Sequence, residues 1–334
     1  MGTQSKKVVV LGSNSFSGQD FIDLALDNPN YSVIGISRSA ERPAHFLRYK
    51  SNPGLNRFRF VQLDLNRDSA ELFKVLDREK PQYVVNFAAQ SEVSPSWEFP
   101  EHWFETNTVA LAKIVNHLRR QNYLERFMQI SSPEAYGNCE GNYSEQTPDN
   151  PSTPYAASKS AADLLLSTYF KQFKFPLITI RATNVYGARQ QLYKIVPRGV
   201  LFLLSGKKID LHGGGEAVKS YIHIRDVSRG ELIALEKGEL GARYHFSPDQ
   251  YVRVRDLVAQ ICILMGKSFE KETVSVAERP GQDAAYVIDS SKSRKFLNWA
   301  PSITLDEGLQ EVASWIKENW EQVKNSPWEY IHKP

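Results

Sequence analysis

The stretch KVVVLGSNSFSGQDFIDLAL, residues 7–26, predicts the fold of this chain. Residues 7–11 are a short β-branched run, typical of a strand buried on both faces of a parallel sheet. Gly12 would permit a tight turn after this strand, and Gly18 would let the following helix pack close to it. The start of that helix would present unpaired N–H groups to an anion such as a pyrophosphate. This order of strand, glycine-rich turn and helix predicts a dinucleotide-binding unit, with an ordinary strand-to-helix turn as the alternative.

The end of the second predicted strand, residues 32–36, indicates which dinucleotide is bound. Ser37, Arg38 and Ser39 follow it, with no acidic residue beside them. An acid at this place would bind the ribose 2′-hydroxyl of NAD, whereas an arginine suits the 2′-phosphate of NADP. We therefore predict NADP as the cofactor, with NAD as the alternative if Arg38 is only a solvated loop residue.

Strand and helix patterns alternate along the first half of the chain. Further strands are predicted at residues 58–65, 81–89, 126–131 and 177–181, and helices at 69–80, 102–120 and 155–173. This alternation predicts a Rossmann-type, doubly wound α/β fold with a parallel sheet. Ligands of such sheets bind beyond the carboxyl ends of the strands. The groups that we expect to meet at this edge are Gly12, Arg38, Asp64, Ala88 and residues 131–134.

Residues 131–159 carry candidate catalytic groups. Tyr155 and Lys159 are four residues apart and would share one face of a helix. A lysine ammonium beside a phenol lowers the pKa of the tyrosine and makes it a usable base. Ser132 and Glu134 follow a predicted strand and would face this pair across a cleft. For the Tyr/Lys spacing alone, a surface helix with a solvated lysine is the alternative.

The composition excludes several classes of function. The 334 residues carry a net charge of +3, which is too small to indicate nucleic-acid binding. We expect no membrane partner, because the sequence shows no apolar run of membrane-spanning length and no secretory signal segment. Cys139 and Cys262 are the only cysteines, and no metal-ligand spacing is present. We therefore expect a cytoplasmic protein without a metal.

The chain also resembles a known family, from residue 7 to about residue 317. It is similar to the extended short-chain dehydrogenase/reductases and, within them, to the nucleotide-sugar 4,6-dehydratases. The motifs that carry the resemblance are the turn at 12–18, DL at 64–65, NFAAQS at 86–91, SSPEAYG at 131–137, Tyr155 with Lys159, RATNVYG at 181–187 and RPG at 279–281. AAQS and Arg38 look most like the GDP-mannose branch, whereas RPG looks more like the dTDP-glucose branch.

The resemblance implies a lyase that converts an NDP-hexose to an NDP-4-keto-6-deoxyhexose by internal hydride transfer through bound NADP. Tyr155 would take the proton of the sugar 4-hydroxyl, and Lys159 would hold the nicotinamide ribose and lower the tyrosine pKa. Ser132 would hydrogen-bond the oxygen at C4. Glu134 would remove the C5 proton before water leaves from C6. The nucleotide of the substrate, GDP or dTDP, UDP or CDP, stays open.

Pro133 departs from the family pattern. The dTDP-glucose branch has an aspartic acid there, which protonates the departing C6 oxygen, whereas proline has no proton to donate. Either Glu134 carries its proton from C5 to the leaving hydroxyl, or Ser132 or a water helps. The alternatives are a nucleotide-sugar epimerase or decarboxylase on the same scaffold, and a non-catalytic nucleotide-binding protein. Glu134 favours chemistry at C5 and therefore the dehydratase.

The resemblance further implies two sets of binding residues. The cofactor set is Gly12, Asn14, Ser15, Phe16, Ser17, Gly18, Ser37, Arg38, Asp64, Leu65, Ala88, Ala89, Gln90, Asn107, Tyr155 and Lys159. The substrate set is Ser91, Ser132, Glu134, Asn184, Lys194, Lys219 and Arg279.

We expect two domains. Residues 1–185 with about 221–245 would form the NADP-binding domain, and about 186–220 with 246–334 a smaller mixed α/β domain for the nucleotide sugar. In the smaller domain we predict helices at 198–205, 252–265 and 304–320, a hairpin turn at 213–215 and an aromatic tail that packs down. The helices at 102–120 and 155–173 match a pair that forms a four-helix interface in the family, so we expect a homodimer.

Overall fold

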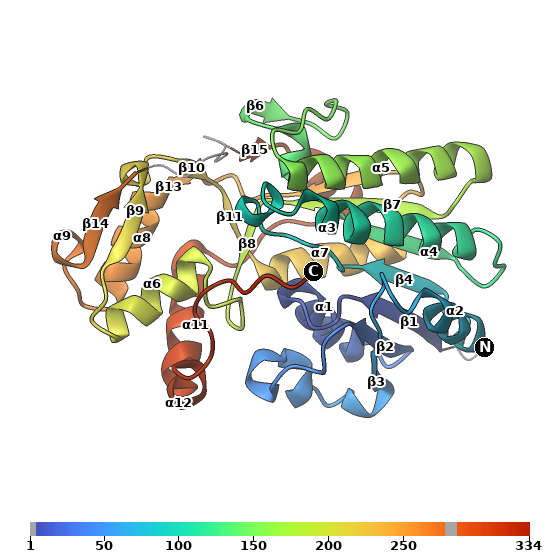
Figure 1. Ribbon diagram of the computed structural model, residues 1–334, viewed down its shortest axis with the longest axis horizontal. Helices are drawn as coiled ribbons and strands as arrows, with labels where there is room; N and C mark the ends of the chain where they lie inside the picture. The colour runs from blue at the N-terminus through green and yellow to red at the C-terminus, as the bar shows by residue number, and fades with distance from the viewer. Residues whose placement is uncertain (1–4, 278–285) are drawn as a thin grey trace.

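The computed structural model describes residues 5–277 and 286–334, without the side chains of 140–142 and 286, and has a seven-stranded sheet at its centre (Figure 1). All neighbouring strands in this sheet are parallel, in the order β12-β7-β5-β4-β1-β2-β3. Because β1 lies between β2 and β4, the chain winds outward from it in both directions. This confirms the predicted Rossmann-type, doubly wound fold. The strands are β1 (Lys6–Leu11), β2 (Tyr31–Ser37), β3 (Phe58–Gln62), β4 (Tyr83–Asn86), β5 (Arg126–Ile130), β7 (Leu177–Ala182) and β12 (Arg243–Phe246).

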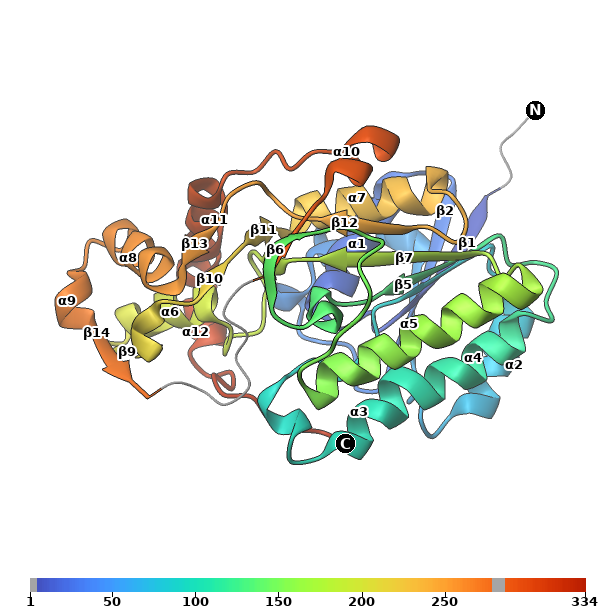
Figure 2. The same cartoon turned by 90° about the horizontal axis from the view of Figure 1, so that it is seen from above.

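Helices cover both faces of the sheet (Figures 1 and 2). Successive side chains of a strand point to opposite faces. Val8 and Val10 accordingly pack in one apolar cluster, with α1 and α7, while Val9 and Leu11 pack in another, with α2, α4 and α5. The β-branched run of β1 is therefore buried on both sides, as its sequence predicts. The helices are α1 (Phe16–Asp27), α2 (Ser69–Glu79), α4 (Leu111–Leu118), α5 (Pro154–Phe173) and α7 (Ile224–Lys237).

The predicted helix at 102–120 contains a rare distortion. It consists of α3 (Pro100–Phe104), a π-helical stretch (Glu105–Ala110) and α4. Such stretches are frequent at functional sites. Asn107 lies in this one, and its side chain hydrogen-bonds the backbone of Gln90, at 2.9 and 3.0 Å, and the hydroxyl of Ser158, at 2.9 Å. It thereby ties the loop after β4 to α5.

A third apolar cluster, away from the sheet, forms the core of the smaller lobe. It consists mainly of residues 186–211 with 257–262 and 309–323. The sequence predicted a hairpin around residues 213–215, and this is wrong. The strand before that turn pairs in parallel with β14, and the strand after it pairs antiparallel with β13. The turn residues Gly213, Gly214 and Gly215 all have positive φ values, of 55°, 68° and 74°, and direct the chain away instead of reversing it. These elements are α6 (Ile195–Leu204), β9 (Ile209–His212), β10 (Val218–Lys219), β13 (Val252–Arg253), α8 (Val254–Leu264), α9 (Phe269–Glu272), β14 (Thr273–Val276), α11 (Leu305–Glu318) and α12 (Trp320–Val323).

Helix α6 begins three residues before its predicted start at residue 198. The prediction began the helix after Pro197, but a proline is tolerated in the first turn, where its missing N–H has no helical partner to lose. The remaining elements connect the two lobes or flank the sheet. They are β6 (Cys139–Tyr143), which pairs with β15 (Tyr286–Ile288), β8 (Asn184–Tyr186), which pairs with β11 (Tyr221–His223), and α10 (Ser291–Leu297).

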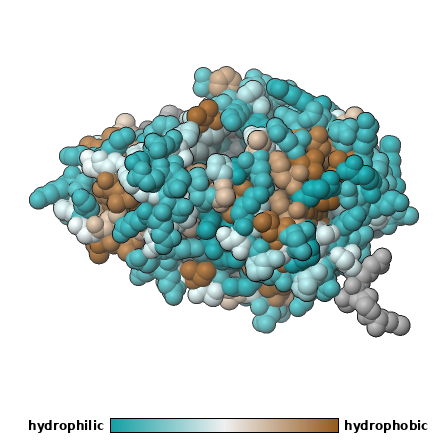
Figure 3. Space-filling view, turned by 90° about the horizontal axis from the view of Figure 1, so that it is seen from below, coloured by the Kyte–Doolittle hydropathy of each residue, from teal (hydrophilic) through white to brown (hydrophobic). Residues whose placement is uncertain are grey.

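The molecular surface is mostly polar. Hydrophilic residues dominate the face in Figure 3, with apolar side chains gathered in smaller areas between them. Within residues 5–277 and 286–334, no helix combines the length and the apolar character that a membrane crossing requires.

Candidate functional site

Two cavities lie at the carboxyl ends of the sheet strands. The first has a volume of about 400 Å³ and is lined by the loops after β1, β2, β3 and β4. The second has a volume of about 270 Å³ and is lined by the loops after β5 and β7 and by the start of α5. Ser15, Phe87, Ala89 and Gln191 line both cavities, so the two adjoin. The predicted meeting of strand ends at one edge is therefore present.

The glycine-rich turn forms one wall of the first cavity. Gly12 has a φ of +82°, and a Cβ there would lie 2.6 Å from the backbone nitrogen of Ala88, so no larger residue fits. A Cβ on Gly18 would lie 2.5 Å from the carbonyl oxygen of Gly12. Ser15 replaces the middle glycine of the usual motif and has an ordinary φ of −68°. Its hydroxyl accepts a hydrogen bond from Gly18 N at 3.0 Å and caps α1, so this departure does not disturb the turn.

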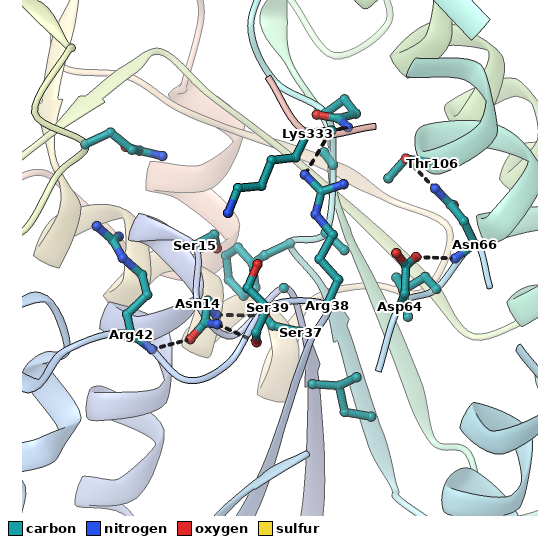
Figure 4. Close-up of a pocket in the computed structure, with 18 residues that line it drawn as sticks. Asn14, Ser15, Ser37, Arg38, Ser39, Arg42, Asp64, Asn66, Thr106 and Lys333 are labelled. Carbon is teal, nitrogen blue, oxygen red and sulfur yellow. Dashed lines mark hydrogen bonds between the residues drawn. The ribbon is translucent and has the colours of Figure 1, made fainter. Parts of the chain in front are cut away.

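Basic side chains line the far end of the first cavity (Figure 4). Arg38, Arg42 and Lys333 lie there, against the single carboxylate of Asp64 among the lining residues. Asn14 fixes the loop after β2, because its amide donates to the carbonyls of Ser39 and Ala40 and accepts from Arg42 N. This wall of the cavity has no room for a side chain at Gly12, and the start of α1 lies beside it. Together with the excess of positive charge, these features fit the phosphates of a dinucleotide.

The side chain of Arg38 makes two hydrogen bonds that the sequence did not indicate. Its guanidinium donates hydrogen bonds to the carbonyl oxygens of Lys333 and Pro334. The side chain lines the first cavity as predicted, but these donors are directed to the C-terminal segment of the chain.

The second cavity brings together all four predicted catalytic residues, Ser132, Glu134, Tyr155 and Lys159. Local capping explains their positions. Ser132 caps a short 3-10 helix (Pro133–Tyr136) by accepting a hydrogen bond from Glu134 N at 3.2 Å. Thr153 caps α5 in the same way, with Pro154 in the first turn, and Tyr155 and Lys159 follow on one face of that helix. Ser91, Asn184 and Lys194 of the predicted substrate set line the same cavity.

Burial dominates the electrostatics of the tyrosine–lysine pair. It raises the pKa of Tyr155, as does the charge of Glu134, and a hydrogen bond from Ser132 lowers it only in part. Lys159 is not among the groups that shift the pKa of Tyr155, and its ammonium donates a hydrogen bond to the carbonyl of Ile130 at 2.5 Å. Burial lowers the pKa of Lys159 to about 8, although the charge of Asp163 works against this.

A buried ionic network underlies this pair. The guanidinium of Arg181 is fully buried and binds both oxygens of Asp149, at 2.9 and 3.0 Å, and one oxygen of Asp163, at 2.6 Å. The same Asp163 oxygen accepts from the hydroxyl of Ser131 at 2.6 Å. Because Ser131 precedes the catalytic loop and Asp163 lies one helical turn after Lys159, the network holds the loop and α5 together.

Other predicted site residues lie elsewhere. Phe16 and Ser17 line the second cavity instead of the first, and Gly18 and Asn107 support the turn and the loop after β4 without lining either cavity. Lys219 is buried on β10 and lines neither cavity. Arg279 lies outside the described residues. The remaining members of the cofactor set, all in the first cavity, are Asn14, Ser37, Asp64, Leu65, Ala88, Ala89 and Gln90.

Four side chains at the site were not predicted. Arg42 and Lys333 line the first cavity, and only the position of Arg42 four residues after Arg38 was a signal in the sequence. Glu92 pairs with Lys194 at 2.7 Å beside the second cavity. Glu231 lines that cavity from α7, and burial raises the pKa of its carboxyl well above the usual value. In the part of the chain that the structure describes, no group of three or more His, Cys, Asp or Glu side chains is arranged to hold a metal.

The chain is similar in sequence to known nucleotide-sugar 4,6-dehydratases. Residues 9–312 match the sequence profile of the family described as GDP-mannose 4,6 dehydratase. The chain is 28% identical over 332 residues to dTDP-D-glucose 4,6-dehydratase of Mus musculus, covering 97% of this chain and 92% of the mouse protein. It is 29% identical over 350 residues to dTDP-glucose 4,6-dehydratase of Neisseria gonorrhoeae, covering 98% of this chain and 100% of that protein.

Solved structures with a similar fold include a dehydratase and an epimerase. The crystal structure of DesIV, a dTDP-glucose 4,6-dehydratase from Streptomyces venezuelae with NAD bound, superposes with a TM-score of 0.87 at 27% identity, over 95% of this chain and 98% of that one. A UDP-glucuronic acid 4-epimerase from Bacillus cereus, also with NAD, gives a TM-score of 0.84 at 25% identity, over 93% and 99%.

The buried network yields a stability prediction. Asp149→Asn should lower the free energy of unfolding by about 3 kcal/mol at pH 7, because it leaves Arg181 less compensated in a buried site. Burial alone would raise the pKa of Asp149, but Arg181 holds it below the usual value. The stabilisation is therefore present above about pH 4 and is lost as the pH falls through the lowered pKa. Denaturant unfolding at pH 7 and pH 3 measures both points.

The matched control is Asp77→Asn, which alters an exposed pair with His117 and should change stability little. Equal effects of the two substitutions at pH 7 would contradict a structural role for the Arg181 network.

Proposed function

Because the chain belongs to the GDP-mannose 4,6 dehydratase family of the extended short-chain dehydrogenase/reductases, we propose that its two adjoining cavities carry out the 4,6-dehydration of a nucleotide-diphosphate hexose. The enzyme is a hydro-lyase of this family. The observation that carries the assignment is the convergence of Ser132, Glu134, Tyr155 and Lys159 in one cavity, next to a glycine-turn cavity that suits a dinucleotide.

The first part of the reaction takes place at C4 of the sugar. A bound oxidised nicotinamide dinucleotide would supply positive charge and would accept the hydride from C4 that later returns to C6. Tyr155 takes the proton of the 4-hydroxyl, and Ser132, which already hydrogen-bonds the phenol, orients the C4 oxygen. Lys159 lies one helical turn after Tyr155 and is fixed on the Ile130 carbonyl at the end of β5.

Glu134 is the residue that we propose for the elimination of water across C5 and C6. The 4-keto group acidifies the proton at C5, and Glu134 accepts that proton as base. Pro133 lines the cavity but has no proton for the departing C6 oxygen, so Glu134 passes the C5 proton to that oxygen and water leaves. One carboxyl group then serves as base and acid in sequence and is ionised again. The return of the hydride to C6 would be completed by a proton that C5 takes up from solvent, and Tyr155 releases to solvent the proton that it took from the 4-hydroxyl.

Epimerases with the same fold remain the nearest alternative activity. A 4-epimerase has no need for a base at C5, whereas Glu134 lines the cavity and its charge acts on Tyr155. A decarboxylase would also use a glutamate at this position, but its product would be lighter than the substrate by carbon dioxide instead of by water. A non-catalytic binding protein would not need all four residues in one cavity.

The cofactor is a nicotinamide dinucleotide, and we infer NADP as its form. The loop after β2 carries no carboxylate for a ribose 2′-hydroxyl, and Arg38 and Arg42 line the cavity there. Burial of Arg42 lowers its pKa, and its guanidinium lies 4.2 Å from the ring of Phe46, which holds it in place. Such a preorganised guanidinium suits a phosphate.

The diphosphate of the substrate would lie toward Asn184 and Lys194 of the second cavity. Lys194 pairs with Glu92, which fixes the position of its ammonium. The predicted contributions of Lys219 and Arg279 stay predictions. Cys139 and Cys262 are both buried and are not joined to each other by a disulfide bond, which supports a reducing, cytoplasmic setting.

A homodimer is supported by apolar side chains on neighbouring helices. Phe104 on α3, Val109 on the π-helical stretch and Leu164 on α5 are 38%, 48% and 63% exposed. The helices that carry them run side by side along one flank of the molecule (Figure 2). Burial of such side chains against a second copy would stabilise an interface.

The base at C5 is tested by Glu134→Gln. We expect dehydration to fall by about 10²–10⁴-fold, because a general base is lost, while dinucleotide affinity stays near normal. The alkaline absorbance of the 4-keto product measures turnover across a panel of nucleotide-hexoses. In D₂O, the wild-type product should carry deuterium at C5. Glu216→Gln, a substitution of an exposed residue outside both cavities, is the control. Turnover of Glu134→Gln within tenfold of the wild type would remove the proposed base.

The cofactor form is tested by equilibrium binding. We expect NADP to bind at least about 10-fold more tightly than NAD, which corresponds to one added charge-assisted contact. Arg42→Ala should weaken NADP and leave NAD unchanged, since only NADP has the 2′-phosphate. An equal or higher affinity for NAD in the wild-type protein would exclude the NADP assignment.

The dimer is tested by the mass in solution, measured by light scattering. Leu164→Glu places a charge on the proposed interface and should yield monomers. Ile263→Glu changes a side chain on the exposed face of α8 in the smaller lobe that is even more exposed than Leu164, and it should leave the mass unchanged. A monomeric wild-type protein would refute the interface.

A further inference from the structure

The last residues of the chain cross from the smaller lobe to the sheet domain (Figure 1). We call residues 328–334 the strap. At its start, Trp328 packs against the apolar cluster of the smaller lobe, and its indole N–H donates to the carbonyl of Val323 at 3.0 Å. The match to the dehydratase family ends at residue 312, before the strap begins.

Aromatic contacts hold the middle of the strap. The ring of Tyr330 lies edge-on to Tyr193, with 5.5 Å between centroids. The ring of His332 stacks on those of Phe99 and Trp103, at 5.0 and 5.2 Å. Its Nε2 lies 2.9 Å from Nδ1 of His102. The strap is therefore docked on α3 and the loop before it by a specific set of ring contacts.

The end of the strap forms one side of the first cavity. The carbonyl oxygen of Lys333 accepts hydrogen bonds from the Arg38 guanidinium and from the amide of Gln90, at 3.1 and 2.6 Å. Arg38 follows β2 and Gln90 follows β4, so the strap bridges two loops on either side of β1. The backbone oxygen of Lys333 thus accepts hydrogen bonds from two side chains, Arg38 and Gln90, that the sequence predicted to bind the cofactor.

The side chain of Lys333 extends into the cavity, on the side of Asn14 and Ser15 (Figure 4). Among the described residues, no hydrogen bond or ion pair is made by its ammonium. Such a cation, beside the start of α1 and across from Arg42, favours an anion between them. The cavity keeps its volume of about 400 Å³ with the strap in place, so the strap encloses this space without filling it.

We propose that the strap closes over the bound dinucleotide, with Lys333 pairing with one of its phosphates and Arg38 and Gln90 holding the strap shut. This inference rests on the proposed dinucleotide site. Release of the dinucleotide then requires the strap to open, which breaks both carbonyl contacts and the ring stack of His332. In the proposed reaction the hydride leaves and returns within one turnover, so the dinucleotide has no need to exchange and a closed strap does not limit the rate.

The experiment measures dissociation of reduced NADP and of NADH from the full chain, by following dinucleotide fluorescence after a chase with excess oxidised dinucleotide. Three variants are compared with the wild type. Lys333→Ala removes the cation, and a chain ending at Tyr330 removes the closing segment but keeps Trp328 and Tyr330. Lys324→Ala removes an exposed lysine that pairs with Glu321 and serves as the control.

We expect the shortened chain to release dinucleotide at least about 10-fold faster, and Lys333→Ala to weaken affinity at least about 5-fold, as for a lost charge-assisted contact. Lys324→Ala should match the wild type. An equal loss for both dinucleotides would place Lys333 on the pyrophosphate, and a loss for NADP alone would place it on the 2′-phosphate.

Wild-type dissociation rates in both strap variants would overturn the proposal while leaving the dinucleotide site intact. Tighter binding by the shortened chain would also overturn it, because the strap would then compete with the dinucleotide. If the wild-type protein bound neither dinucleotide, the proposed function itself would fail. Circular dichroism checks the fold of the shortened chain, and Lys333→Ala tests the contact in a chain of full length.

Discussion

All seven strands of the central sheet run in the same direction, and this constraint places their carboxyl ends at one edge. Helices then have to cover both faces, which is why β1 buries Val8 and Val9 in different clusters. The order of the strands brings the loop after β1 against the loop after β4. Gly12 is needed at that contact because a side chain would meet the backbone of Ala88. Both cavities arise from the same edge.

Within the second cavity, burial has the largest effect on the pKa values of Tyr155 and Lys159. Desolvation pushes Tyr155 and Lys159 toward their neutral forms, and the charge of Glu134 adds to the effect on Tyr155. Asp163 counters it for Lys159, but Asp163 is itself shared with Arg181. The pKa of Lys159, about 8, lies near neutrality, so a small addition of charge decides which form of the lysine is present.

The strap adds a connection that the alternation of strands and helices does not supply. It begins in the core of the smaller lobe at Trp328 and ends on Arg38 and Gln90 in the sheet domain. A dinucleotide that donates its hydride back to the same sugar gains from slow release, because loss of the reduced form would leave the intermediate without its hydride. Long retention and internal redox chemistry are therefore compatible requirements of one site.

The sequence by itself determined the parallel fold and the glycine turn, and it supplied the four residues proposed as catalytic, because each depends largely on short-range spacing. Residues 7–18 carry the period of a buried strand and the glycines of a tight turn, and Tyr155 and Lys159 need only one helical turn to share a face. Tertiary structure alone decided the pairing of β9 with β14, the burial that raises the pKa of Tyr155, and the contact of Lys333 with Arg38. These depend on partners far apart in the chain, nearly 300 residues in the last case, and no local pattern encodes which distant side chains meet.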